Sequence, residues 1–417
     1  MDFLKKACLS AGLLVVAQAH AADPVELELP PGFEATVFAS GLGRARHLVV
    51  RGNGDVYVTM RRSKDGKGVI GLRDNDGDGV ADLQAAFGHA GGTGVAIYRD
   101  YLFFSSDDTV YRMKFADDEL VPGGDLEVVV SGFPRQSSHA AKSLAIGADG
   151  SLFVNSGAPS NACQKRARSA GSKGQNPCPQ LFRGGGIWRF SADRLDQDQV
   201  ADGQRYVTGI RNSVALAFND AAGELYFVMH GRDQLDSLWP RFFSADQREE
   251  LPAEEFHLAL EGSDFGWPYT YYDGLKNRRM IGPEYGGNGK KTAPDGKYPD
   301  PLVAFPAHWA PNALVFYAGT QFPAEYRGGA FVAFHGSWNR APGVQRGYQL
   351  AFVPMKDGKP SADWHTFADG FMGDRAIRNP AQAKHRPVGL AVGPDGSLYV
   401  SDSTGGTVWK ISYSTAD

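Results

Sequence analysis

Short runs in which apolar and polar residues alternate recur along the chain. In residues 151–155, Leu152 and Val154 lie on one face of an extended chain and Phe153 lies on the other. This period of two, with its β-branched and aromatic content, predicts a strand. The Asp149-Gly150 pair before it predicts a tight turn, since glycine tolerates a positive φ and aspartate hydrogen-bonds its own backbone. A second apolar run, residues 144–146, precedes the turn, so the segment is predicted to be a β-hairpin.

This hairpin pattern occurs six times. The copies span residues 45–58, 94–104, 137–157, 214–228, 313–333 and 388–400. Repeats of about 40–50 residues built from short strands are typical of a β-propeller with one blade per repeat. We therefore predict an all-β fold, a six-bladed β-propeller with four-stranded antiparallel blades, forming one domain over residues 22–417. The longer gaps before the fourth and fifth copies predict insertions around residues 158–185 and 232–305.

Two further strands are expected at the ends of the domain. Residues 34–39 form an alternating run outside the six copies, and residues 407–412 form the last such run of the chain. A propeller must join its first and last blades or leave two open sheet edges. The N-terminal strand is therefore expected to pair with the C-terminal one.

The first 21 residues have the pattern of a secretory signal peptide. Lys5 and Lys6 precede a short apolar run, and small residues lead up to Ala21. This predicts a periplasmic or secreted protein. The run is too short to cross a bilayer, and no later segment reaches about 20 apolar residues, so no membrane span is expected. The formal net charge of −4 argues against a nucleic-acid partner.

The cysteines support export. Cys8 lies within the predicted signal peptide, which leaves Cys163 and Cys178 in a polar stretch of the mature chain. An exported chain with one such pair is expected to form a disulfide. Two thiols are too few for a typical zinc site.

An acidic segment between the first and second copies predicts a structural calcium site. Carboxylates alternate along residues 74–82, and glycines allow the chain to curl around one hard cation, with a spacing similar to that of an EF-hand loop. The expected ligands are Asp74, Asp76, Asp78, the carbonyl of Val80, and Asp82. The EF pattern is incomplete because no glutamate occupies its twelfth position, and a solvated acidic turn is the alternative.

Candidate chemistry lies at the upstream ends of the repeats. The strand that opens a blade lines the central channel, so residues just before it gather at one rim. These positions hold His89, His139, Lys142, Arg211, Asn212, His308 and Arg386. An isolated histidine is more often structural, but recurrence at one rim favours a functional role for His139 and Arg211. Such a ring suits a planar anion, since guanidinium groups grip carboxylates in a bidentate manner and stack on flat rings.

These residues resemble a known family, the pyrroloquinoline quinone (PQQ)-dependent soluble glucose and sorbosone dehydrogenases. The resemblance covers essentially the whole mature chain. It rests on the His139 hairpin, residues 208–212 (TGIRN), residues 264–268 (DFGWP), and Arg386 with the turn at 394–396. Residues 335–340 (HGSWNR) and the cysteine loop resemble the sorbosone branch. The resemblance implies a six-bladed propeller that oxidises a sugar or sugar aldehyde and passes the electrons to an external acceptor, a quinone or cytochrome.

The resemblance also implies roles for single residues. His139 would be the general base that takes the substrate hydroxyl proton while hydride passes to the quinone. Arg211 and Asn212 would contact the quinone oxygens, and Arg211 would stabilise charge on the reduced quinone. The backbone carbonyls of Gly231 and Arg232 would hold the calcium ion that polarises PQQ.

Further cofactor contacts follow from the same resemblance. Arg386 would bind a PQQ carboxylate, and Lys142 and Arg340 are candidates for the family's cofactor lysine. The chain departs from the glucose enzymes at His89, where they have a glutamine, and at His308, where they have a threonine. Ser138 replaces an acid before the base, and Arg232 replaces a proline.

Two other classes of protein remain open. A calcium-dependent propeller lactonase would place acidic metal ligands at the axis, whereas this rim offers histidines and arginines. A non-catalytic binding propeller would not bind PQQ. Trp267 and the aromatic residues at 269–272 are candidates for an aromatic wall that contacts a sugar ring, with a packed loop core as the alternative.

Overall fold

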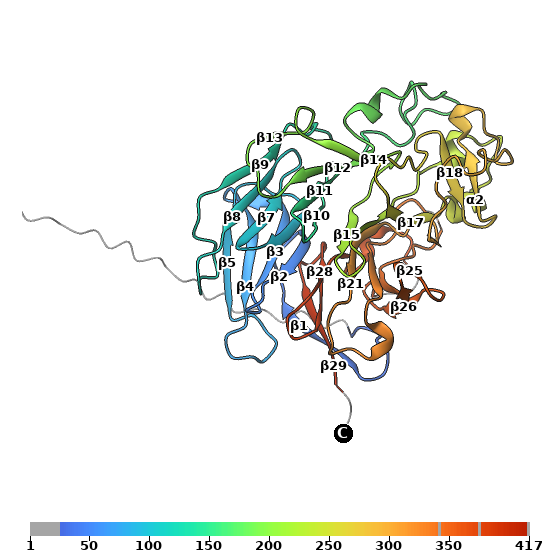
Figure 1. Cartoon of the computed structure of the whole chain (residues 1–417). Coiled ribbons are helices and arrows are strands. Elements are labelled where there is room, and N and C mark those ends of the chain that lie inside the picture. The colour runs from blue at the N-terminus through green and yellow to red at the C-terminus, as the bar shows by residue number, and fades with distance from the viewer. Residues whose placement is uncertain (1–25, 341–342, 374–376, 415–417) are drawn as a thin grey trace, which may run out of the picture.

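Six β-sheets are arranged around a central axis (Figure 1). The structure, a computed structural model, describes residues 26–340, 343–373 and 377–414. Each sheet contains one of the six predicted hairpins, so the all-β, six-bladed β-propeller is confirmed. Residues 1–21, the predicted signal peptide, lie outside the described residues. Within the described part of the chain, no helix has the length and apolar character needed to cross a membrane.

The first three blades contain residues 45–208. The first blade consists of β2 (Ala45–Val50), β3 (Val56–Lys64), β4 (Lys67–Arg73) and β5 (Leu83–Phe87). The second consists of β6 (Val95–Tyr98), β7 (Tyr101–Ser105), β8 (Val110–Lys114), β9 (Glu127–Ser131) and β13 (Gln197–Asp198). The third consists of β10 (Leu144–Ile146), β11 (Ser151–Ser156), β12 (Gly186–Ser191) and β14 (Gln204–Thr208).

The remaining three blades complete the ring. The fourth consists of β15 (Ala215–Asn219), β16 (Glu224–Met229), β17 (Glu254–Ala259) and β20 (Val303–Phe305). The fifth consists of β21 (Pro311–Phe316), β22 (Ala330–Phe334), β23 (Gln349–Val353) and β26 (His365–Ala368). The sixth consists of β27 (Pro387–Val392), β28 (Leu398–Asp402), β29 (Val408–Tyr413) and β1 (Phe33–Ala39).

The ends of the domain close the ring as expected. The N-terminal strand β1 pairs antiparallel with β29, from Phe33 opposite Tyr413 to Ala39 opposite Val408. The last blade is therefore built from both ends of the chain, and this pairing covers two edges that would otherwise be open.

One blade departs from the four-stranded prediction. The short strand β13 leaves the third blade and pairs in parallel with β9 of the second. Its Gln197 side chain is buried and donates hydrogen bonds to the carbonyls of Ser191 (2.8 Å) and Arg194 (2.9 Å). The connection between β12 and β14 is thereby fixed across the outer edge of the preceding blade.

The alternation in the third hairpin explains how blades pack. Leu152 and Val154 of β11 lie in a cluster with Phe103 of the second blade. Phe153, on the opposite face, packs in a cluster with Phe227 of the fourth blade. Both faces of the strand are buried, so the hydrophobic core lies between neighbouring blades rather than on one side of a single sheet.

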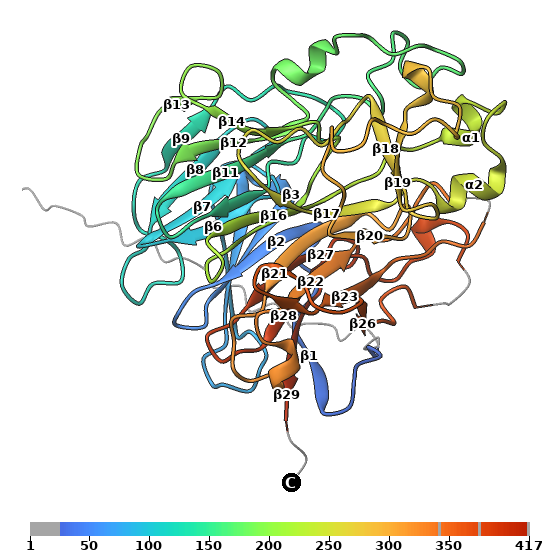
Figure 2. The ribbon, with the colours of Figure 1, turned by 45° about the vertical axis from the view of Figure 1, so that its right-hand side comes forward.

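The insertions gather at one end of the molecule (Figure 2). They contain α1 (Leu235–Leu238), α2 (Ala245–Glu250), β18 (Thr270–Asp273), β19 (Arg278–Ile281), and the 3₁₀ helices η1 (Pro179–Phe182) and η2 (Pro283–Tyr285). The two insertions contact one another, because Cys178 N–H donates to Tyr269 Oη (3.0 Å) and Gly171 N–H to Leu238 O (2.9 Å). Elsewhere lie η3 (Ala324–Tyr326), η4 (Pro380–Gln382) and the hairpin of β24 (Met355–Lys356) and β25 (Lys359–Pro360).

The predicted disulfide is confirmed. Cys163 and Cys178 are bonded, with their Cα atoms 6.2 Å apart. Of the two alternatives for the aromatic residues of the second insertion, the structure shows the packed loop core, because Trp267, Tyr271 and Tyr272 are buried. The Trp267 Nε1–H donates to Asn161 O (3.0 Å), so this ring holds the cysteine loop rather than facing a ligand.

Candidate functional site

A cavity of about 340 Å³ lies at the axis, beside the start of the inner strands. Of the predicted site residues, it is lined by His139, Arg211, Asn212, Gly231 and His308. His139 and Arg211-Asn212 precede β10 and β15, and His308 precedes β21, so the upstream positions of three successive blades meet here. The same lining contains residues that the sequence analysis did not select, namely Arg46, Arg61, His230, Asp233, Glu254, His335, Trp338 and Asn339.

The His139 ring is fixed in one tautomer. Its Nδ1 lies 2.6 Å from the carbonyl oxygen of Ala158, which can only accept, so Nδ1 carries the proton and Nε2 carries a lone pair. Burial, and then the nearby Arg211 guanidinium, lower the pKa of His139 to about 3. The ring is therefore neutral at physiological pH and able to accept a proton at Nε2.

Arg211 is held by a buried carboxylate. Its Nη2 lies 2.6 Å from Oδ2 of Asp233, and both side chains are less than a tenth exposed. Asp233 also accepts from Arg168 (3.0 Å) and from Asn339 Nδ2 (2.8 Å). Burial alone would raise the pKa of Asp233, but these cations, Arg211 foremost, lower it to about 2. The ionised Asp233 thus fixes the guanidinium of Arg211 at the cavity.

Asp233 also ties the cysteine loop to the site. The side chain of Asn161, two residues before Cys163, accepts from the Asp233 N–H (2.9 Å) and donates to the Asp233 carbonyl (2.9 Å). The disulfide loop and the fourth-blade connection therefore position Arg211 together. A single aspartate in a loop gives no sequence signal for this role.

Two more histidines contribute neutral rings to the site. His230 Nε2 lies 2.6 Å from the carbonyl of Pro311, and burial lowers the pKa of His230 to about 4. His308 Nε2 lies 2.7 Å from the carbonyl of Arg248, while its Nδ1 accepts from Asn339 (3.1 Å). Both nitrogens of His308 are engaged, so this ring positions Asn339 rather than presenting a free lone pair.

Glu254 is a buried carboxylate in the cavity wall. It accepts the backbone N–H groups of Gly231 (2.7 Å) and Ala310 (3.2 Å). Burial raises the pKa of Glu254 to about 8, although these two N–H groups oppose the shift. The only sequence signal is an acidic pair, Glu254-Glu255, at the start of a strand that is largely buried.

A second, arginine-rich cavity of about 420 Å³ adjoins the first. Arg46, Arg61 and His335 line both cavities, and Arg44 and Arg386 line the second. Among the described residues, Arg61 is the member of this group with a carboxylate partner, Asp107 at 2.9 Å. Burial and the neighbouring Arg61 lower the pKa of Arg46 to about 10. This excess of positive charge around the cavity is suited to an anion with several carboxylates.

Arg386 is positioned by its own hydrogen bonds. Its Nε and Nη2 donate to the carbonyls of His335 (2.9 Å) and Gly336 (2.8 Å). The signal for Arg46 was present in the sequence, since it lies at the start of the first hairpin copy, as Arg386 does in the last. A search of the residues just before the first strand of every hairpin copy would have selected Arg46.

Four of the residues predicted for the cofactor site lie outside the lining of both cavities. His89 is exposed, with its ring against Tyr111. Lys142 is fully buried, donates to the carbonyl of Ala140 (2.7 Å), and has a pKa lowered by burial to about 8. Arg340 pairs with Glu249 and Glu250, and Arg232 pairs with Glu284. The positive charge of each of these two arginines is therefore compensated by glutamates of the protein itself.

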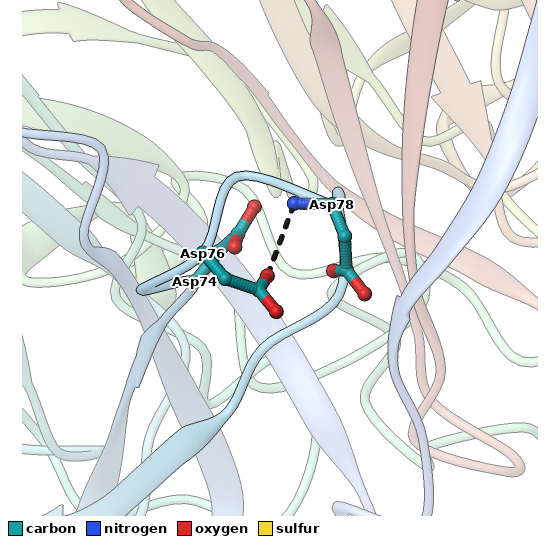
Figure 3. A group of neighbouring side chains, drawn as sticks. All are labelled: Asp74, Asp76 and Asp78. Atoms are coloured by element: carbon teal, nitrogen blue, oxygen red, sulfur yellow. Dashed lines mark hydrogen bonds between the residues drawn. The ribbon is translucent and has the colours of Figure 1, made fainter.

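The acidic loop connects β4 to β5 (Figure 3), and none of its aspartates lines either cavity. Oxygen atoms of Asp74, Asp76 and Asp78 lie within 4.8 Å of one another. Asp82 instead accepts from Asn75 N–H (2.6 Å), and the Val80 side chain is exposed. Calcium binding by this loop stays a prediction.

Replacing Asp76 tests the calcium prediction. In the wild-type protein, saturating calcium should raise the thermal midpoint, because a ligand at 100 times its Kd stabilises the folded state by about 2.7 kcal/mol. Asp76→Asn removes one charge from the cluster and should abolish this shift. Asp220→Asn, an exposed acid in the turn of another blade, is the control and should behave as wild type. An equal calcium response in Asp76→Asn would show that the loop is a solvated turn.

The buried histidines predict acid sensitivity of the metal-free apoprotein. Burial lowers the pKa of His47 and His230 to about 4 and that of His139 to about 3, so between pH 6.5 and 4 the unfolded chain binds protons that the folded protein does not. Stability should fall by about 2 kcal/mol per histidine between pH 7 and 5. Glu254, with its raised pKa, offsets part of this loss because its folded form binds a proton below pH 8.

Urea unfolding at the two pH values checks this expectation. The midpoint should be lower at pH 5 than at pH 7. His47→Gln removes one of the three histidines and should make the difference smaller. A midpoint that is the same or higher at pH 5 would contradict the assignment of these rings as neutral and buried.

The fold and the site together define a class of protein. Its members are six-bladed propellers whose axial cavity is lined by histidines and arginines. The chain belongs to the TrAA12-like family, whose model matches residues 27–414.

Curated relatives match parts of the chain. A pyrroloquinoline quinone-dependent pyranose dehydrogenase of Coprinopsis cinerea is 27% identical over 282 residues, which are 59% of this chain and 37% of the relative. An uncharacterized protein of Borreliella burgdorferi is 30% identical over 207 residues, 49% of this chain and 48% of the relative. The chain thus spans half or less of the length of these relatives.

Solved structures match nearly the whole chain. The holo form of the pyranose dehydrogenase PQQ domain from Coprinopsis cinerea has a TM-score of 0.73 and 20% identity, covering 93% of this chain and 97% of that one. The calcium structure of a Trichoderma reesei carbohydrate-active enzyme of family AA12 has a TM-score of 0.73 and 18% identity, covering 94% and 98%. At these identities the likeness shows the fold. The resemblance to PQQ-dependent sugar dehydrogenases is confirmed, while membership of the sorbosone branch stays a prediction.

Proposed function

We propose that the protein is a PQQ-dependent oxidoreductase that oxidises a sugar or sugar aldehyde. The observation that carries the proposal is the pair of adjoining axial cavities. One presents a neutral, tautomer-fixed His139 beside Arg211, and the other presents guanidinium groups with few carboxylate partners. The printed names of the relatives support the same cofactor and substrate class.

The residues present fit the cofactor. PQQ is a flat quinone with several carboxylates, and bidentate arginine contacts are the strongest that a carboxylate makes in a protein. Arg46, Arg61 and Arg386 would hold these carboxylates. The buried Nε of Arg211 has no hydrogen-bond partner among the described residues, which leaves it a donor for a quinone oxygen, and Asn212 lies beside it.

PQQ, when bound, supplies a hydride acceptor, which no side chain provides. The substrate carbon would lose its hydride, and His139 Nε2 would take the hydroxyl proton, so that a carbonyl forms. Arg211 would stabilise negative charge at the cofactor. An anion in the cavity would raise the pKa of His139, because it offsets the repulsion between the imidazolium and Arg211.

A calcium ion at the cavity belongs to the same proposal. The carbonyls of Gly231 and Arg232 are its proposed ligands, and the hydrogen bond from Gly231 N–H to Glu254 fixes the backbone at that point. Lys142, Arg340 and His89 are not needed for cofactor binding in this arrangement, since none of them lines either cavity.

The alternatives are less well supported. Among the described residues, one group of at least three side chains could hold a metal ion. It lies in the acidic loop at Asp74 and not at the axis. The two axial carboxylates, Asp233 and Glu254, are occupied by guanidinium and backbone N–H groups. This argues against a lactonase with acidic metal ligands in the channel. The protein is proposed to act in the periplasm or outside the cell and to reduce an external quinone or cytochrome.

Reconstitution tests the proposal. Purified apoprotein titrated with PQQ and calcium should show a saturable change in the ultraviolet–visible spectrum, and the loaded protein should reduce a dye in the presence of aldoses or sugar aldehydes. PQQ binding without dye reduction across the sugar panel would contradict the proposed substrate class. A protein that does not bind PQQ at all is not this enzyme.

A further inference from the structure

The axial cavity has one flat apolar surface. Among the described residues that line it, Trp338 is the only phenylalanine, tyrosine or tryptophan, and the other lining side chains are charged, polar or small. Trp338 is half exposed (50%), so the ring reaches both the cavity and the solvent. It belongs to neither the proposed base nor the arginine groups that would hold the cofactor.

The residues on both sides of Trp338 are held by hydrogen bonds and ion pairs. Ser337 is fully buried, and its Oγ donates to Gln345 (2.7 Å) while its N–H donates to the carbonyl of Arg346 (2.9 Å). Asn339 is fixed by Asp233 and His308, and Arg340 by Glu249. The polar side chains thus hold the backbone in place, and the tryptophan between them projects from it.

The exposure of this ring is unfavourable in the free protein. A large aromatic side chain favours burial, and no ring pairing with Trp338 is found among the described residues. By contrast, Trp267 and Trp309 are packed against neighbouring groups. An uncovered ring on a hydrogen-bonded segment beside a polar cavity is the arrangement of a binding platform, in which aromatic surface provides contact area and a few polar groups fix orientation.

We infer that Trp338 is the stacking platform for the ring of the sugar substrate. A sugar ring has an apolar C–H face and hydroxyl groups at its edge. The C–H face would lie on the indole, and the hydroxyls would face the polar wall that includes Asn212, Glu254 and Asn312. The inference rests on the proposed function and adds to it the residue that selects for a ring-shaped substrate.

Steady-state kinetics of PQQ-loaded variants test this inference. Trp338→Ala should raise KM for the best aldose about tenfold and change kcat little, since an aromatic contact of this kind is made before and during the reaction alike. Trp338→Phe should recover most of the affinity. Phe182→Ala, which removes an exposed aromatic ring outside the cavity lining, is the matched control and should leave both constants unchanged.

Two measurements separate this inference from the proposed function. PQQ titration should give the same affinity for Trp338→Ala as for the wild type, which also shows that the variant folds. Tryptophan fluorescence of wild-type apoprotein should change on addition of the sugar, and the change should be lost in Trp338→Ala.

Other outcomes would overturn the inference while leaving the cofactor assignment in place. An unchanged KM for sugar in a PQQ-binding, active Trp338→Ala variant is one of them. A variant whose KM rises only for the dye is another, because Trp338 would then contact the electron acceptor. Failure of the wild type to bind PQQ would instead contradict the proposed function, and the fluorescence titration would still report on Trp338.

Discussion

His139→Gln should lower kcat by about 10²–10⁴-fold, the contribution that a general base typically makes. Glutamine is close in size and keeps a polar group that can reach the Ala158 carbonyl, so the loop should stay in place. It cannot accept the proton that the substrate hydroxyl must lose. PQQ affinity should remain nearly unchanged, because the proposed cofactor contacts are made by other side chains.

The measurement is dye reduction at saturating sugar, combined with a PQQ titration of the same preparation. His365→Gln is the control, since that histidine is exposed on β26, the edge strand of its blade, and lines neither cavity. If His139→Gln turns over normally, the base is another group, and His230 is next, because its Nδ1 carries the lone pair when Nε2–H donates to Pro311.

Arg211→Ala should weaken PQQ binding as well as turnover, unlike His139→Gln. A hydrogen bond to a charged group contributes about 1.5–3 kcal/mol, so PQQ affinity should fall by about 10- to 100-fold, together with turnover. Asp233 keeps Arg168 and Asn339 as partners in this variant, so its carboxylate is not left uncompensated and the fold should survive. Spectroscopic titration with PQQ measures the effect directly.

Arg211→Lys separates charge from geometry. The ammonium keeps the positive charge but cannot contact Asp233 and the cofactor through a planar fork, so its PQQ affinity should lie between those of wild type and Arg211→Ala. Arg99→Ala removes an exposed arginine paired with Asp193 and serves as the control. A PQQ affinity that is the same in Arg211→Ala and wild type would remove Arg211 from the cofactor site.

The repeat of hairpins determined the fold class. An alternating strand buried on both faces requires a neighbour on each side, as Phe103 and Phe227 provide for β11. Six such units with one unpaired strand at each end can satisfy this requirement only by closing into a ring. Blade number, closure between β1 and β29, and the position of the upstream loops at the channel therefore followed from local patterns.

The position of residues just before the inner strands predicted part of the site. His139, Arg211, Asn212 and His308 lie before inner strands and line the cavity, because inner strands of all blades start near the axis. His89 occupies a similar place in the chain but is exposed, since it ends the connection from β5 and its ring turns outward onto Tyr111.

The tertiary structure alone decided which charges are available. The sequence marked Lys142 and Arg340 as cationic candidates for the cofactor site. In the structure, Lys142 donates to a carbonyl of its own loop, and Arg340 is paired with two glutamates of α2. Asp233, Glu254 and Trp338 come from insertions and from the far ends of strands, where no periodicity applies. Their roles depend on contacts between residues far apart in sequence, such as that between Asp233 and Asn339, and a linear pattern contains no information about such a pairing.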